Sequence, residues 1–159
     1  MGMIVDKKRV AVMALVAVLC SVMVTAESYI VNSVDWRDIY SGLMYGHVTK
    51  RKVNYVPSDR AGDYLLQPHL QSNKLVVLSS KKLPFKFGYE EEISDKGLVN
   101  VDELEFENIN LNLFERLNSS FRKFIVIDDS YGYNAISVAP YASLAGYYVL
   151  FVDKENVNQ

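Results

Sequence analysis

The feature that most constrains the fold is an internal repeat of residue type. The segment 29–57, which begins YIVNSVDW, matches the segment 124–153, which begins FIVIDDSY. The aligned pairs are Val31 with Val126 and, after one inserted residue, Asp38 with Asn134, Ser41 with Ser137 and Tyr45 with Tyr141. The offset of the later pairs is 96 residues. Similarity at a fixed spacing predicts that one supersecondary unit occurs twice.

Each copy has the pattern of a strand, a helix and a second strand. A short apolar run rich in β-branched and aromatic residues is followed by polar turn and cap formers, such as Asp35 in the first copy and Asp129 in the second. Apolar residues at helical spacing come next, and a further apolar run closes each unit, at 53–56 and 148–152. A crossover through a helix joins parallel strands, so each copy is predicted to be a βαβ unit.

The chain between the copies alternates helix and strand patterns. The expected elements are a helix within 59–66, a strand at 75–78, a helix from about Glu90 ending at Gly97, a strand within 98–106 and a helix over 111–117. We therefore predict the α/β class: a Rossmann-like layered domain with a mostly parallel sheet, built on the βαβ repeat, in which both copies share that sheet.

The stretch DDSYGYNAISVAPYASLAG, residues 128–146, is rich in small residues. We interpret its alanines and Gly146 as a helix face that lies close against a sheet. Gly132, between Tyr131 and Tyr133, suits a tight turn at the strand end. Pro140 predicts a kink or a break between two short helices.

The first 26 residues have the composition of a secretory signal peptide. Lys7, Lys8 and Arg9 precede the apolar run 10–24, and small residues stand at 24 and 26, before a cleavage site. An uncleaved membrane anchor is the alternative. Cys20 is the only cysteine and lies in this segment, so the mature domain, 27–159, would contain no disulfide.

The composition excludes several classes of function. The net charge of −2 offers no basic surface for nucleic acid. No dinucleotide, phosphate-loop or nucleophile-elbow motif occurs, so no cofactor is expected. His47 and His69 belong to no metal or nucleophile pattern and are assigned structural or surface roles, and no metal site is expected.

Acidic residues at the carboxyl ends of the predicted strands are the candidate site. Ligands of open parallel sheets bind at that edge. Capping of the following helices is the simplest role for these acids; binding of a cation or a sugar, or general-base catalysis by Asp128 or Asp129, are the alternatives. The weakly predicted ligand-binding set is Asp35, Asp38, Asp128, Asp129, Tyr131 and Asn134.

The repeated segments resemble the signature of the cell-wall-binding repeat type 2 family. Asn134-Ala135 and Ala139-Pro140-Tyr141-Ala142 carry the likeness, and NSVDWRDIYSGLMYG, 32–46, is a degraded form of it. The resemblance implies a Rossmann-like module on a cell surface, where members of the family occur as tandem copies, assemble in threes and hold extracellular proteins to anionic wall polymers. The chain would hold about one and a half such modules. Its 11 tyrosines suggest a relative among archaeal surface-layer proteins.

These observations together predict an exported, non-catalytic cell-surface domain for envelope attachment or surface assembly. Its partners would be an envelope polymer or a surface-layer protein, with self-association as a further possibility and membrane contact only if the N-terminal segment is retained. An exported solute- or sugar-binding protein that uses the crevice at the strand ends is the alternative function, and a hydrolase is the third.

Overall fold

The computed structural model describes residues 27–58, 65–69, 74–97 and 100–153. The predicted signal segment, 1–26, lies outside the described residues, as does most of the helix expected within 59–66. In the described part of the chain, no helix has the length and apolar character needed to cross a membrane.

The chain is an α/β protein, as predicted, and the strand pairs within the described residues are all parallel. Four strands form one sheet in the order β2-β1-β3-β4, and two form a second sheet, β5-β6. The bounds are β1 Glu27–Asn32, β2 Lys52–Tyr55, β3 Lys74–Ser80, β4 Val101–Phe106, β5 Phe124–Asp128 and β6 Tyr148–Val152. The helices are α2 Trp36–Thr49, η1 Gln67–His69, α4 Tyr89–Asp95, α5 Ile109–Glu115 and α6 Gly132–Ala145.

The repeat is confirmed as two parallel βαβ units: the first unit, β1-α2-β2, and the second unit, β5-α6-β6. Helices α2 and α6 have 14 residues each, and both their ends are offset by 96 residues. Ser28 lies beside Lys52 and Phe124 beside Tyr148, a separation of 24 residues in each unit. The equivalent residues Lys50 and Gly146 end the two helices in the left-handed conformation.

One detail of the sequence alignment was wrong. The offset is already 96 in the first strand, so Val31 is equivalent to Ile127 rather than to Val126, and the inferred insertion is absent. Of the two outcomes predicted for Pro140, the break is absent, because helix α6 continues through it. Only Ala135 and Ala142 of its alanines are buried, so the face in close contact is narrower than the small residues suggested.

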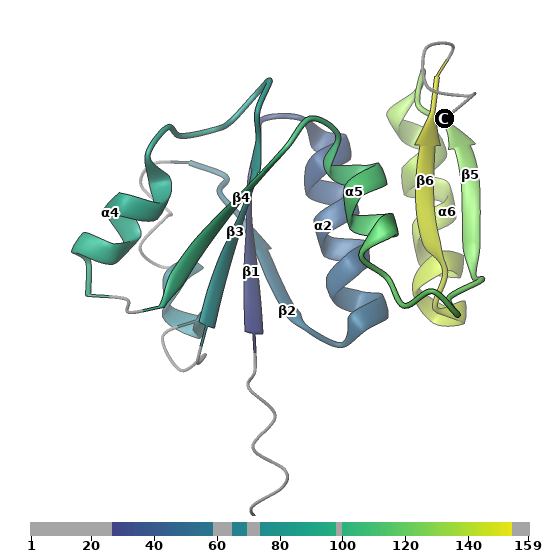
Figure 1. Cartoon of the computed structure of the whole chain (residues 1–159). Coiled ribbons are helices and arrows are strands. Elements are labelled where there is room, and N and C mark those ends of the chain that lie inside the picture. Colours follow the sequence, from purple (N-terminus) through teal and green to yellow (C-terminus); the bar gives the residue numbers. More distant parts are fainter. Residues whose placement is uncertain (1–26, 59–64, 70–73, 98–99, 154–159) are drawn as a thin grey trace, which may run out of the picture.

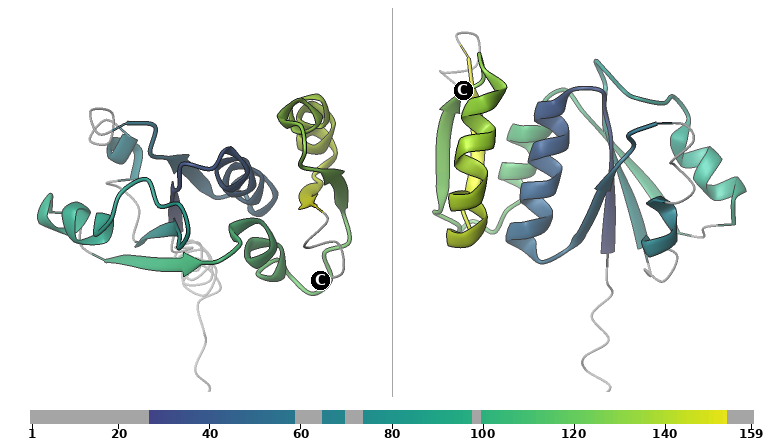
Figure 2. Two further views of the ribbon diagram at one scale, coloured as in Figure 1. Left: turned by 90° about the horizontal axis from the view of Figure 1, so that it is seen from above. Right: turned by 180° about the vertical axis from the view of Figure 1, so that it is seen from behind.

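The expectation of one common sheet was also wrong. The second unit forms its own two-stranded sheet, on the far side of α2 and α5 from the main sheet (Figure 1). The layers are therefore α4 with η1, then the main sheet, then α2 with α5, then the second unit (Figure 2). The physical reason is that β6 packs against α2 and α5, which cover one face of the main sheet and hold the second unit away from its edges.

Two apolar clusters fill the main sheet's two faces, because successive strand residues point to opposite sides. Tyr29 and Val31 of β1 join a cluster with α2, α5 and β6, while Ile30 joins a second cluster beneath α4 and Leu66. Helix α2 lies close to its strands because Gly42 and Gly46 have no side chain. A Cβ at Gly46 would be 2.2 Å from Cγ2 of Val53.

Candidate functional site

A hollow of about 390 Å³ lies where the carboxyl ends of the strands in both units meet. In the first unit, residues at the start of α2 line the hollow. In the second unit, the lining residues lie at the ends of β5 and β6. The segments that follow β3 and β4 form the rest of the wall. Its lining residues are Asp35, Arg37, Asp38, Ser80, Lys82, Leu83, Glu107, Asn108, Asn110, Asp129, Phe151 and Asp153. The site therefore belongs to both copies of the repeat.

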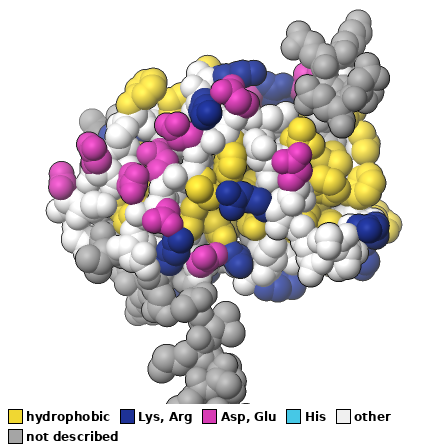
Figure 3. Space-filling model, in the orientation of Figure 1, with side chains coloured by type: hydrophobic (Ala, Val, Ile, Leu, Met, Phe, Trp, Pro, Cys, Tyr) yellow, Lys and Arg dark blue, Asp and Glu magenta, His cyan; other side chains and the backbone are white. Residues whose placement is uncertain are grey.

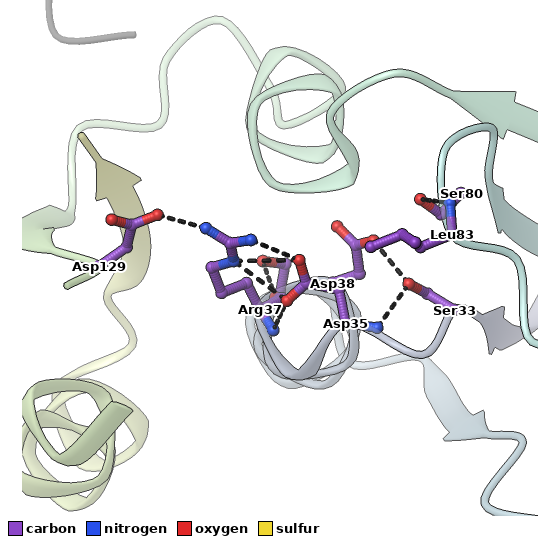
Figure 4. Close-up of polar contacts among 8 residues, drawn as sticks. Ser33, Asp35, Arg37, Asp38, Ser80, Leu83 and Asp129 are labelled. Carbon is purple, nitrogen blue, oxygen red and sulfur yellow. Dashed lines mark hydrogen bonds and ion pairs between the residues drawn. The ribbon is translucent and has the colours of Figure 1, made fainter. Parts of the chain in front are cut away.

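Arg37 joins the two units across this hollow (Figure 4). Its Nη2 lies 2.6 Å from Asp35 Oδ2, and its Nη1 lies 2.5 Å from Asp129 Oδ2. The Asp35 hydrogen bonds, together with the nearby Asp129, raise the pKa of Arg37 above its ordinary value. Burial acts to raise the pKa of Asp35, but the hydrogen bonds from Arg37 outweigh it and leave that pKa lowered. The two carboxylates thus hold the guanidinium between them by charge-assisted hydrogen bonds.

Asp35 has a second role, as the cap of α2. Its Oδ1 accepts a hydrogen bond of 2.9 Å from the backbone N–H of Arg37, as a cap residue does. The equivalent position in the second unit is Tyr131, which makes no side-chain cap bond. The predicted capping role is therefore confirmed at Asp35, and the same residue also lines the site.

Asp38 is a half-buried carboxylate that lines the hollow. Burial raises its pKa, and the charge of Asp35 adds to this, while the hydrogen bond from Ser33 opposes it. Ser33 Oγ donates to Asp38 Oδ2 at 2.7 Å, and its oxygen accepts from the N–H of Asp35 at 3.1 Å. This local network ties the turn between β1 and α2 together.

Asn110 is the second residue of α5 and also lines the hollow. It is almost wholly buried. Its Nδ2 donates to the carbonyl of Val149 at 2.8 Å, and its Oδ1 accepts from the N–H of Phe151 at 3.0 Å. On the edge of β6 that faces away from β5, the Asn110 side chain thus makes the hydrogen bonds that a neighbouring strand would otherwise make. Nδ2 also donates to Ser41 Oγ on α2 at 2.8 Å, so a single amide links α5, α2 and β6.

The structure brings together three of the six predicted site residues, Asp35, Asp38 and Asp129. The other three lie outside the hollow: Asp128 is exposed and its Oδ1 accepts from the N–H of Ser130, Tyr131 stacks on Tyr133, and Asn134 Nδ2 donates to the Asp128 carbonyl. Asp128 is the last residue of β5 and its side chain lies on the exposed face of that strand, whereas Asp129 follows the strand and is held by Arg37.

Sequence reasoning missed Arg37, Lys82 and Asn110. Arg37 lies two residues after the predicted cap Asp35, and an arginine so near a capping carboxylate could have indicated an ion pair. Nothing in the sequence distinguishes Asn110 from other asparagines. Among the described residues, no three His, Cys, Asp or Glu side chains are grouped to hold a metal ion.

No family model and no curated protein sequence matches the chain. Among solved structures, the fold is similar to that of Cwp8 from Clostridium difficile, with a TM-score of 0.55 and 17% sequence identity over 80% of this chain. The match spans 23% of the Cwp8 chain. The chain therefore has a layered α/β fold that also occurs within a cell-wall protein.

Proposed function

We propose that this chain is an exported, non-catalytic cell-surface domain that attaches to the cell envelope or takes part in surface assembly. The observation that carries the proposal is the polar hollow at the carboxyl ends of parallel strands, the usual ligand position in open α/β sheets. The fold likeness to Cwp8, a cell-wall protein, and the signal-like segment 1–26 support the location.

The chemistry of the hollow favours hydroxyl groups as ligands. Its lining carries five acids, Asp35, Asp38, Glu107, Asp129 and Asp153, against two bases, Arg37 and Lys82. A phosphate or carboxylate group would be repelled by this excess of negative charge. Carboxylates, amides and serine hydroxyls are good partners for the hydroxyls of a sugar or polyol. We infer that the hydroxyl-rich portion of an envelope polymer binds here.

The arrangement of the acids supports a binding role rather than a hydrolytic one. Asp129 is held by Arg37, and Asp128 lies outside the hollow, so neither is placed as a general base towards a ligand in it. Asp38 has a raised pKa, but its carboxylate is engaged by the Ser33 hydroxyl at the start of α2.

The proposal can be tested by co-sedimentation of the exported protein with purified envelopes of its source organism. Asp38→Asn keeps the shape of the side chain and removes a half-buried charge, and Lys82→Ala removes a donor at the rim. We expect each to weaken envelope binding by about tenfold. Glu91→Ala, on α4 and outside the hollow, is the matched control. Unchanged binding by both hollow variants would contradict the proposal.

Solute binding is the second candidate, and one observation favours it. A volume of about 390 Å³ lies within the range of small-ligand pockets. Under this alternative, free mono- or disaccharides raise the unfolding temperature of the protein and Asp38→Asn abolishes the rise, while envelopes do not sediment it. Sedimentation with envelopes and no response to free sugars supports attachment instead.

A further inference from the structure

The two edges of the β5-β6 sheet differ. The outer edge of β6 is covered, because the Asn110 side chain bonds to Val149 and Phe151 there. On the other edge, no strand among the described residues pairs with β5. The equivalent strand of the first unit, β1, has a neighbour on both sides, β2 and β3. Within the described residues, the second unit therefore has no counterpart of β3 beside its first strand.

The backbone of β5 presents hydrogen-bonding groups at this edge. The Lys123 carbonyl accepts from the N–H of Tyr148, and the Asp129 N–H donates to the carbonyl of Val152, so these odd-numbered positions face β6. Because backbone groups alternate in direction along a strand, the N–H and C=O groups of Phe124 and Val126 face away from β6. A row of such groups is a template for pairing with another strand.

The side chains beside this edge are apolar and exposed. Phe124 is 43% exposed and Val126 51%, whereas Ile30, the equivalent of Val126, is buried at 1%. In the space-filling view, apolar side chains gather on the right of the molecule, over the second unit (Figure 3). The edge therefore combines an apolar strip with open backbone groups.

The alternate residues Phe124, Val126 and Asp128 of β5, together with Arg122 just before the strand, form a self-complementary series from basic to acidic. Arg122 and Asp128 are both exposed. In the single copy, the Arg122 guanidinium donates to the carbonyls of Ser119 and Phe121. A parallel copy would place like charges together, but an antiparallel copy reverses the series. We propose that β5 pairs antiparallel with β5 of a second copy of this chain, about a two-fold axis at Ile125. Arg122 then lies opposite Asp128 of the second copy, and Phe124 opposite Val126 of the second copy.

This register agrees with the backbone as well as with the side chains. A two-fold axis perpendicular to the sheet keeps the side chains of both copies on the same face. Residues that lie opposite one another must therefore both have even numbers or both have odd numbers, as 124 and 126 do. In the pair Phe124–Val126 both residues direct N–H and C=O groups to the partner, as a hydrogen-bonded antiparallel pair requires. Aromatic with β-branched pairs and opposite charges are the favourable cross-strand combinations. The joined sheet, β6-β5-β5-β6, has four strands, and the proposal is independent of the attachment function.

A charge-swap experiment tests the pairing. The full chain is purified in the form that the expression host exports, and its mass is measured by sedimentation as a function of concentration. We expect a monomer–dimer equilibrium for the wild type. Arg122→Asp or Asp128→Arg alone should weaken dimerisation by about tenfold or more, because two attractive pairs become repulsive in each case. Mixing the two single variants should restore the dimer, since each copy then supplies both partners of the other's charges.

The controls make each result decisive. Glu91→Arg, an exposed charge reversal on α4, should leave the dimer unchanged. Circular dichroism of every variant checks that the fold is intact, and both substituted side chains are exposed. The proposal is overturned by a monomeric wild type, by single variants that still dimerise, or by a mixture that stays monomeric. A dimer insensitive to the swap would place the contact elsewhere, for example on the apolar outer face of α6.

Discussion

Ile30 and Val126 are equivalent residues of the two units, 96 positions apart, and differ sharply in exposure, at 1% and 51%. The same comparison holds for whole strands: β1 lies between β2 and β3 beneath α4 and Leu66, whereas β5 has one neighbour and an open face. Local structure is nonetheless the same, with equal helix lengths and equal register.

The βαβ arrangement is thus determined within each unit, whereas the stability of each unit depends on the elements that pack against its strands. Two strands alone bury too little surface to be stable. The second unit is held because β6 packs on α2 and α5 and because Asn110 bonds to its edge. We therefore expect the second unit to depend on the first, and the first to depend less on the second.

The largest expected effect is the difference in stability between alanine substitutions at the equivalent residues Ile30 and Val126. Ile30→Ala removes a side chain packed in the cluster under α4 and should lower the free energy of unfolding by about 3–4 kcal/mol. Val126→Ala should lower it by less than about 1 kcal/mol, because that side chain is half exposed. Urea unfolding of both variants measures the difference. Equal losses would mean that the two strand faces are covered alike in solution.

The contact between the units is tested at Asn110. Asn110→Ala leaves the Val149 carbonyl and the Phe151 N–H without their partner in a buried place, and should cost about 2–3 kcal/mol. Hydrogen exchange should accelerate first in β6. Asn112→Ala, on the same helix but bonded only loosely to Glu115 at 3.5 Å, is the control and should change little. A loss spread evenly over both units would argue against Asn110 as the link.

Acid should weaken the first unit before the second. Burial, aided by the charge of Lys52, lowers the pKa of His69 from 6.5 to about 4, and its Nε2 accepts from Asn54 Nδ2 of β2. Between pH 6.5 and 4, the His69 imidazole is therefore protonated in the unfolded state and neutral in the folded state. The contribution of neutral His69 to the free energy of unfolding is fully present above pH 6.5. It is lost as the pH falls towards 4, and the loss is about 3 kcal/mol at most.

His69→Gln removes this titration, so its free energy of unfolding should vary less between pH 7 and 4 than that of the wild type. The wild type, measured under the same conditions, is the reference. Chemical unfolding at several pH values measures both. A His69→Gln variant with the same pH dependence as the wild type would assign the acid effect to other groups.

The smallest expected effect concerns how closely each helix lies on its strands. Gly46→Ala would place a Cβ 2.2 Å from Val53 Cγ2 and should cost about 1–3 kcal/mol. Ala142 is the equivalent residue of α6, where a methyl group is accommodated and buried. Ala142→Gly should cost about 1 kcal/mol through lost helix propensity. Thermal unfolding compares the two; a stabilised Gly46→Ala variant would show that α2 can move outward at no cost.

The candidate site was predictable in part. Capping chemistry and the strand-end rule identified Asp35 and Asp129, because both depend on local order along the chain. Asp38 was included through its place in the repeat, opposite Asn134. The same rule included Asp128, Tyr131 and Asn134, which the structure places outside the hollow. Lys82 and Asn110 come from segments between the copies, and no local pattern relates those segments to the repeat.

The sequence by itself determined the two βαβ units, their parallel strands and the order of helices and strands, because apolar periodicity, caps and crossover length act over short distances. Only the tertiary structure decided that the second unit stands apart from the main sheet, with its outer strand open. That choice depends on contacts between residues far apart in the chain, Asn110 with Val149 and Arg37 with Asp129. Side-chain hydrogen bonds of this kind leave no periodic signal in the sequence.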